Sequence, residues 1–364
     1  MHIVILGLSI TSSWGNGHAT TFRGLVRELA AQGHRVTFLE RDVPWYAAHR
    51  DLPQPPYCRT ELYADLADLR ARFAGEVASA DATIVGSYVP EGVAVGEWVQ
   101  ETARGIVGFY DIDTPVTLAK LAEGDHEYLH PSLIAGYDVY LSFTGGPTLE
   151  RLEREFGSPC ARALHCAFDP DLYHPEAVEA AWDLGYLGTY SDDRQPRVDS
   201  LLVQPARRWP EGRFVVGGPM YPDTIAWPGN VERRDHVPPD AHRRFYNQQR
   251  FTLNVTRDDM IRAGWSPSVR LFEAAACGVP IISDAWEGID SLFRPGDEIL
   301  LAERPDEVLA ILQGMDDAQR RAIGLRARER VMAEHTAAHR AAQLVALLEA
   351  LATARRPSAV AEGA

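Results

Sequence analysis

The stretch "SPSVRLFEAAACGVPIISD", residues 266–284, predicts a short helix followed by a buried strand. Ser266 is a good N-terminal cap, Pro267 suits the first helical position, and three consecutive alanines favour helix. Gly278 ends the helix, and the apolar run after it is typical of a strand inside a sheet. Glu273 is the only carboxylate of this apolar helix, and a buried carboxylate is costly unless something pairs with it.

The position of Glu273 suggests two roles for its carboxylate. Glu273 lies seven residues beyond Ser266, which is about 10 Å along a helix axis. The free N–H groups at the start of a helix bind anions, so a diphosphate bound there would place the hydroxyls of its ribose near Glu273. The alternative is an ion pair with Arg270, three residues earlier on the same helix face.

Outward from this stretch, apolar runs alternate with helical patterns along the whole chain. The predicted strands lie at 3–8, 34–40, 82–88, 105–113 and 139–144 in the first half, and at 183–190, 213–218, 251–256, 279–284 and 298–303 in the second. Strands that alternate with helices predict an α/β protein with parallel sheets. A polar stretch with two prolines separates the halves, so we expect two Rossmann-like domains.

The predicted domain boundaries follow from this pattern. We expect an N-terminal domain at 1–170, a C-terminal domain at 180–330, a helix at 331–355 and a disordered tail at 356–364.

Composition narrows the class of partner. The formal net charge is −15, which argues against a protein that binds nucleic acid through its phosphates. We expect no transmembrane segment and no signal peptide, and four scattered cysteines favour a reduced, cytoplasmic protein. Lys120 is the only lysine, so any bound phosphate would be held by arginines, backbone N–H groups and helix ends.

Several segments resemble a known superfamily. "SVRLFEAAACGVPIISD" (268–284) resembles the donor-site helix of the GT-B glycosyltransferases, where a pattern like "LEAMACGxPVV" precedes a strand. "LGTYSDDRQPR" (187–197), "LNVTRDDMIRAGWSPSVRLFEAAACG" (253–278) and "DAWEGID" (284–290) more closely resemble the spore maturation protein CgeB and its relatives. The resemblance covers most of residues 184–300 and is looser over the N-terminal half.

This resemblance implies the GT-B fold, in which two Rossmann-like domains face a central cleft. It implies a nucleotide sugar on the C-terminal domain, an acceptor on the N-terminal domain, and a last helix that packs back on the N-terminal domain. It also implies that no metal and no bound cofactor are needed.

The predicted donor-binding residues come partly from the resemblance and partly from position. The resemblance implies that Glu273 binds the donor ribose and that Arg194 binds phosphate. Trp265 stands where many retaining members carry a second glutamate, so the stereochemical outcome stays open. Arg257 follows a predicted strand, at the sheet edge where α/β proteins bind ligands, and Arg270 lies on the helix itself. The predicted donor-binding set is Glu273, Arg257, Arg194, Arg270, Ser268, Gly217, Gly218 and Val237.

Two members of this set lie at the end of the predicted strand at 213–218, and a third, Val237, lies in the later segment "ERRDHVPPD" (232–240). Gly217 and Gly218 either let a ligand approach the backbone or form a plain turn. The resemblance places Val237 where the backbone contacts the donor base.

The predicted acceptor side has two candidate bases. His18 begins a helix and titrates near neutral pH, so it can take a proton from an acceptor hydroxyl, or it can simply be a polar residue at a helix start. Asp113 follows a predicted strand and suits either base duty or helix capping. Asn16 and Gly17 in the preceding glycine-bearing loop, and Asp111, are the predicted acceptor contacts.

We therefore expect a glycosyltransferase that moves a sugar from a UDP- or dTDP-sugar to an acceptor hydroxyl or another nucleophile. One alternative is a nucleotide-sugar epimerase or hydrolase on the same fold. A second is an NAD-linked oxidoreductase with Glu40 on the ribose, although the chain has no GxGxxG motif after its first strand. A third is a non-catalytic surface-assembly protein.

Overall fold

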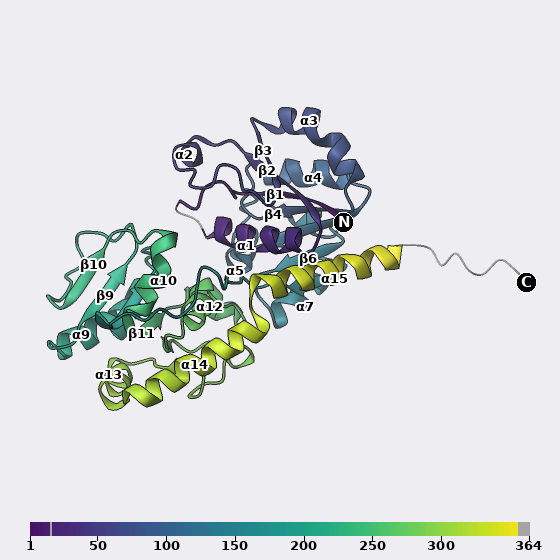
Figure 1. Cartoon of the computed structure of the whole chain (residues 1–364). Helices are drawn as coiled ribbons and strands as arrows, with labels where there is room; N and C mark the ends of the chain where they lie inside the picture. Colours follow the sequence, from purple (N-terminus) through teal and green to yellow (C-terminus); the bar gives the residue numbers. More distant parts are fainter. Residues whose placement is uncertain (15–16, 356–364) are drawn as a thin grey trace, which may run out of the picture. The chain divides into compact units, whose positions relative to one another are not determined.

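A computed structural model describes residues 1–14 and 17–355 of the protein (Figure 1). The chain forms two compact units. Unit 1 combines Met1–Cys166 with the C-terminal segment that starts at Ala337, and unit 2 is Ala167–Thr336. Asn16 and the predicted tail at 356–364 lie outside the described residues.

Unit 1 is built on a seven-stranded parallel sheet in the order β3-β2-β1-β4-β5-β6-β7. Its strands are β1 (His2–Gly7), β2 (Arg35–Arg41), β3 (Arg59–Tyr63), β4 (Ala82–Gly86), β5 (Ile106–Asp111), β6 (Val139–Ser142) and β7 (Ala161–Ala163). Its helices are α1 (His18–Ala31), α2 (Pro44–Ala47), α3 (Leu66–Ser79), α4 (Gly92–Thr102), α5 (Thr114–Ala122), α6 (Pro131–Ile134), α7 (Pro147–Arg154) and α15 (Ala337–Arg355).

Both faces of the unit 1 sheet are covered, because alternate residues of each strand enter different cores. Ile3 and Ile5 of β1 pack in the core under α1 and α15, which lie side by side in Figure 1. Val4 and Leu6 enter the opposite core with side chains of α3 to α7. The apolar run of β1 is therefore continuous because the strand is buried on both faces.

Unit 2 has a six-stranded parallel sheet in the order β10-β9-β8-β11-β12-β13. Its strands are β8 (Trp182–Leu187), β9 (Phe214–Gly217), β10 (Val231–Arg234), β11 (Gln249–Asn254), β12 (Ile281–Ser283) and β13 (Leu300–Leu301). Its helices are α8 (Gln195–Val198), the π-helix η1 (Asp199–Val203), α9 (Gln204–Arg208), α10 (Pro239–Asn247), α11 (Asp258–Ala263), α12 (Val269–Ala276), the 3₁₀ turn η2 (Ile289–Ser291), α13 (Pro305–Gly314) and α14 (Asp317–Glu334).

The two faces of the unit 2 sheet are also covered. Side chains of η1, α9 and α13 form the larger core with Leu184 and Val216. Phe245 of α10 packs with Val215 in a smaller core on the other face, where α12 contacts α10. The prediction of an α/β protein with two parallel sheets is confirmed.

The start of α12 corrects one detail of the prediction. The helix begins at Val269, so Ser268 and not Ser266 occupies the capping position, and Pro267 precedes the helix. Ser266 is fully buried, and the Ser268 hydroxyl donates to Asn254 (2.8 Å between Oγ and Oδ1) instead of capping a backbone N–H. Glu273 therefore lies about 7.5 Å beyond the capping residue and not 10 Å.

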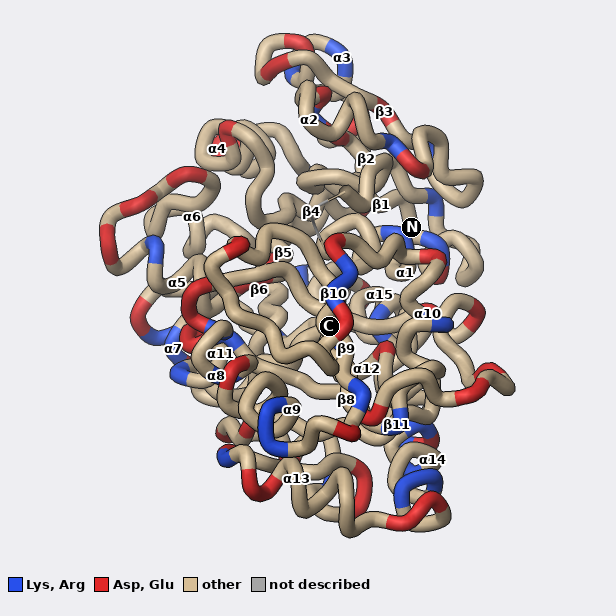
Figure 2. Tube along the Cα trace, turned by 90° about the vertical axis from the view of Figure 1, so that its left-hand side faces the viewer, with Lys and Arg blue, Asp and Glu red and all other residues tan. Residues whose placement is uncertain are grey.

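Figure 2 shows acidic and basic residues interspersed along elements such as α14, so the net negative charge is not gathered on that helix. Among the described helices, none is long and apolar enough to cross a membrane.

Candidate functional site

The carboxyl ends of the unit 2 strands bring most of the predicted donor residues to one sheet edge. The strand order changes direction between β8 and β11, and ligands of α/β sheets bind outside the carboxyl ends at such a point. Arg194 lies in the segment after β8, Gly217 ends β9, and Arg257 lies in the segment after β11. The chain thus places these three residues at the expected edge.

Glu273 is buried on α12, with 5% of its surface exposed. The phenol of Tyr246, on α10, donates to its carboxylate (3.1 Å between Oη and Oε2). Burial and the charge of Glu273 raise the pKa of Tyr246 well above its ordinary value, so this phenol stays a donor. Tyr173 also faces this carboxylate, whose charge and hydrogen bond add to burial in raising the pKa of that phenol. Two phenols use two of about four acceptor positions of a carboxylate, which leaves capacity for ligand hydroxyls.

The alternative ion pair between Arg270 and Glu273 is not formed among the described residues. The Arg270 guanidinium donates to the carbonyl of Leu187 and to Asn254 (2.8 Å between Nη1 and Oδ1), and it lies 4.9 Å from the ring centre of Tyr186. Both Arg270 and Ser268 therefore converge on Asn254 at the end of β11. These contacts fix the start of α12 against the ends of β8 and β11.

The other two predicted arginines contact polar groups of the same edge. The Arg257 Nε lies 3.5 Å from Oδ2 of Asp193. The Arg194 guanidinium donates to the carbonyl of Thr189 (2.6 Å) and to the hydroxyl of Ser191 (3.2 Å). Burial of Asp193 is outweighed by hydrogen bonds from Ser191 and from a backbone N–H and by the charge of Arg257, so its pKa is lowered. A bound phosphate would compete with Asp193 for Arg257.

The predicted glycines are explained by close approach within the protein. A Cβ on Gly218, whose φ is +138°, would lie 2.0 Å from the carbonyl oxygen of Gly188. A Cβ on Gly217 would lie 2.9 Å from the side chain of Val237, which is itself buried. The carbonyl of Val237 lies 3.0 Å from Nε2 of His242. These three residues shape the β8 and β9 ends of the edge.

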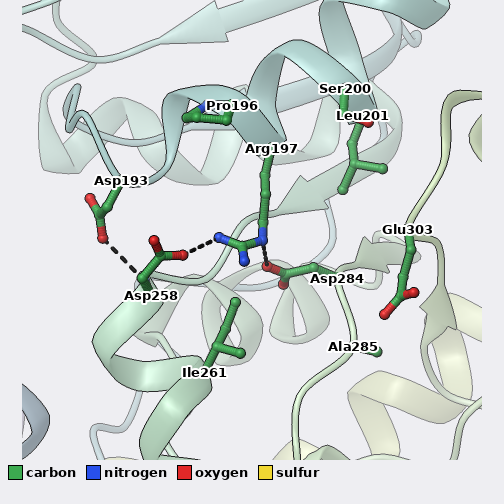
Figure 3. Close-up of a pocket in the computed structure, with 10 residues that line it drawn as sticks. All are labelled: Asp193, Pro196, Arg197, Ser200, Leu201, Asp258, Ile261, Asp284, Ala285 and Glu303. Carbon is green, nitrogen blue, oxygen red and sulfur yellow. Dashed lines mark hydrogen bonds and ion pairs between the residues drawn. The ribbon is translucent and has the colours of Figure 1, made fainter.

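A pocket of about 520 Å³ adjoins this edge between α8, η1, α11 and the ends of β12 and β13 (Figure 3). Arg197 pairs with Asp258 and lies 3.9 Å from Oδ2 of Asp284. Asp284 accepts hydrogen bonds from the N–H and the hydroxyl of Thr256, and burial raises its pKa. None of the eight predicted donor residues is among the ten that line this pocket.

In unit 1, His18 and Asp113 both contact the side chain of Tyr88. His18 begins α1, and its ring lies edge-on to the ring of Tyr88 with 5.4 Å between centroids. The Tyr88 hydroxyl donates to Asp113 (3.1 Å between Oη and Oδ2). Burial lowers the pKa of His18 to about 4, so its imidazole is neutral at pH 7. Gly17 caps α1 and is exposed.

Asp111 is placed differently from Asp113. Its carboxyl is fully buried and accepts hydrogen bonds from Tyr140 (2.5 Å), Thr117 (2.8 Å) and the N–H of Asp113 (3.1 Å). Burial raises the pKa of Asp111 to about 6, although these donors oppose the shift. Asp113 occupies the capping position of α5 but its side chain makes no capping hydrogen bond. Asp111 thus fixes the backbone of Asp113 by accepting the hydrogen bond from its N–H.

Comparison with known proteins finds one matching sequence family and several similar structures. Residues 194–346, which include Arg194, Arg257 and Glu273, match a family described as glycosyl transferase-like. Sucrose-phosphate synthase from Thermosynechococcus elongatus has a similar structure over 97% of this chain and 100% of its own, with 18% identity and a TM-score of 0.72. Anabaena HepE in complex with UDP-glucose matches over 96% and 100% (12% identity, TM-score 0.70), and an α-glucosyltransferase in complex with UDP matches over 96% and 100% (12%, 0.67).

The chain has the GT-B fold. At these identities the structural likeness establishes the fold alone. A comparison with curated proteins by sequence finds no match.

Within this GT-B chain, three residues of the two edges were not predicted from the sequence. Tyr246 pairs with Glu273, Asn254 joins Arg270 to Ser268, and Tyr88 joins His18 to Asp113. Each acts through a partner at least 14 residues away, so no local motif marks it. A positive φ at Tyr88 is visible only in the structure.

Glu40, the acid considered for an NAD-linked reaction, is already hydrogen-bonded within unit 1. Its fully buried carboxylate accepts hydrogen bonds from the N–H groups of Ile10 and Thr11 and from the hydroxyls of Ser9 and Thr11. Four donors saturate a carboxylate, so Glu40 holds the β1–α1 loop and has no capacity for a ribose.

Proposed function

We propose that this GT-B chain is a glycosyltransferase that transfers a sugar from a UDP- or dTDP-sugar to an acceptor hydroxyl. The observation that carries the proposal is that the glycosyl transferase-like match spans the residues gathered at the edge of the unit 2 sheet. That HepE was solved with UDP-glucose supports a nucleotide sugar as the donor class.

On the donor side, each residue has a chemical role in the proposal. Glu273 accepts hydrogen bonds from the two ribose hydroxyls, alongside the one from Tyr246. The diphosphate lies near Arg257 and Arg194, and the N–H groups at the start of α12 add positive potential. Arg270 and Ser268 keep that helix end in place through Asn254.

On the acceptor side, a base at the edge of the unit 1 sheet takes a proton. The acceptor oxygen forms a bond to the anomeric carbon of the sugar while the bond from that carbon to the diphosphate oxygen breaks. The acceptor proton passes to His18 or Asp113, and the nucleoside diphosphate leaves with its new charge offset by the arginines.

The test combines turnover with binding. Purified protein is incubated with a panel of UDP- and dTDP-sugars and candidate acceptors, and both released nucleoside diphosphate and glycosylated product are measured. Nucleotide release without acceptor would favour the epimerase or hydrolase alternative, and binding without release would favour a non-catalytic protein.

Glu273→Gln is expected to weaken UDP or dTDP binding by about ten- to a hundredfold by calorimetry, because a hydrogen bond to a charged group contributes about 1.5–3 kcal/mol. Glu298→Gln is the matched control, since Glu298 is an equally buried carboxylate of unit 2 that pairs with Arg330. Equal affinity in wild type and Glu273→Gln would refute the donor site. A loss shared by both variants would indicate a general effect on unit 2.

A further inference from the structure

Tyr88 has a backbone conformation that calls for an explanation. It follows β4 by two residues and has a φ of 62°, in the left-handed region that residues with a side chain rarely adopt. Such a conformation costs free energy and persists only where the surroundings over-determine it. The surroundings of Tyr88 include two ring contacts, a nearby ammonium and one directed hydrogen bond.

The ring of Tyr88 is packed between other side chains. The His18 ring contacts it edge-on at 5.4 Å, and the Tyr128 ring lies 4.5 Å away on a tilted plane. The ammonium of Lys120 lies 5.7 Å from the centre of the Tyr88 ring and 5.5 Å from that of Tyr128. These contacts set the direction in which the Tyr88 hydroxyl points.

The Tyr88 hydroxyl begins a ring of contacts that passes through Asp113 and returns to Tyr88. It donates to the Asp113 carboxylate, whose backbone N–H donates to Asp111. Thr117 donates to Asp111 and lies 2.8 Å from the Tyr128 hydroxyl. Since the Tyr128 ring contacts Tyr88, the path returns to its start. Rotation of the Asp113 carboxylate would break the hydrogen bond that it accepts from the Tyr88 hydroxyl.

We propose that Tyr88 is a positioning residue that aims the carboxylate of Asp113 at the acceptor hydroxyl and makes Asp113, and not His18, the group that takes the proton. This inference rests on the proposed glycosyl transfer. Asp113 touches the reacting oxygen, whereas Tyr88 acts only through Asp113. His18 packs against the Tyr88 ring as a neutral imidazole and takes no proton.

The charge states of Tyr88 and His18 agree with this assignment. Burial, followed by the charge of Asp113, raises the pKa of Tyr88 far above its ordinary value, so the phenol remains a donor and does not compete for the acceptor proton. With a pKa lowered to about 4, the His18 imidazole is neutral at pH 7. The difference between the two candidate bases is geometric, because Tyr88 directs a hydrogen bond at the Asp113 carboxylate and meets His18 only through a ring contact.

The experiment compares Tyr88→Phe, Asp113→Asn and the double variant in steady-state transfer with the best donor from the panel. Tyr88→Phe keeps the ring contacts, so we expect a melting temperature close to wild type, a kcat lower by about ten- to a hundredfold and an unchanged donor KM. Asp113→Asn is expected to lower kcat by about 10²–10⁴-fold. The double variant should lose no more than Asp113→Asn alone, because Tyr88 acts through the carboxylate.

Tyr63→Phe is the matched control. Tyr63 is a fully buried tyrosine of unit 1 whose hydroxyl has no hydrogen-bond partner among the described residues, so its loss should leave kcat unchanged. Wild-type kcat in Tyr88→Phe, or additive losses in the double variant, would overturn the role of Tyr88 while leaving the proposed function intact. Absence of transfer by the wild-type protein with every donor would overturn the proposed function, and the role of Tyr88 with it.

Discussion

The two sheet edges hold their carboxylates by different means. At the unit 2 edge, Asp193 lies against Arg257 and Asp284 lies near Arg197, so these two carboxylates face cations in addition to the hydrogen bonds they accept from hydroxyl and backbone N–H groups. At the unit 1 edge, Asp111 and Asp113 accept hydrogen bonds from tyrosine and threonine hydroxyls and from a backbone N–H.

This difference suits the two halves of the proposed reaction. A guanidinium that faces a carboxylate can exchange it for a phosphate, because both anions satisfy the same fork of donors. A carboxylate held by uncharged hydroxyls keeps its direction without a cation beside it, which suits a proton acceptor. In the proposal, Arg257 of the unit 2 edge therefore exchanges the Asp193 carboxylate for a phosphate, whereas the unit 1 edge keeps the Asp113 carboxylate in one orientation.

At the unit 2 edge, the largest effect is expected from removal of Arg257. Arg257→Ala should lower kcat/KM for the donor by about 10²–10³-fold, because a preorganised donor to the leaving phosphate is lost. Arg262→Ala, which removes an exposed arginine of α11 paired with Asp259, is the control. Comparable activity in both variants would show that Arg257 does not contact the leaving group.

A smaller change of opposite sign is expected from Asp193→Asn. This variant removes the carboxylate that faces Arg257 while keeping a group able to accept the hydrogen bond from the N–H of Asp258. Affinity for UDP or dTDP, measured by calorimetry at low salt, should rise severalfold, because the phosphate no longer displaces an anion and pairs of exposed charges contribute about 0.2–1 kcal/mol. Weaker binding would mean that Asp193 is needed to shape the loop.

The smallest effect concerns pH and the unit 1 edge. The folded pKa of His18 is about 4 and its ordinary value is 6.5, so between these values only the unfolded chain holds the proton. His18 therefore lowers the free energy of unfolding as the pH falls from 6.5 to 4. Asp111 has the opposite sign, because its folded pKa of about 6 exceeds its ordinary value of 3.8, and its contribution to stability is lost as the pH rises from 3.8 to 6.

His18→Gln should accordingly flatten the fall in stability between pH 6.5 and 4 in urea unfolding monitored by fluorescence. His236→Gln, at an exposed position of unit 2, should leave the slope unchanged. An unchanged slope in His18→Gln would show that folding does not lower the pKa of His18.

The parts of the fold that the sequence predicts are those in which pattern and burial agree. Strands inside the sheets such as β1 and β9 are nearly continuous apolar runs because they are covered on both faces. The strands that were not predicted, β3 (Arg59–Tyr63), β7 (Ala161–Ala163) and β10 (Val231–Arg234), are all edge strands. Charged side chains on such strands protect an open edge and remove the apolar signal.

The site residues divide in a similar way. Glu273 and Arg257 stand out in the sequence because a charged residue follows or interrupts an apolar run. Their predicted roles remain proposals, and the structure shows where they lie. Tyr246, Asn254 and Tyr88 carry no such mark, since each becomes significant only when the sheet brings a distant partner to it.

The single lysine of the chain has a practical consequence. Apart from the N-terminus, the ammonium of Lys120 is the only amine available for acylation, and it lies over the ring of Tyr88. A fluorophore attached there would report on one location beside Tyr88 without any engineered cysteine. Because the Glu127 carboxylate raises the pKa of this amine, conjugation calls for alkaline buffer, and protection from labelling by an added acceptor would map where that acceptor sits.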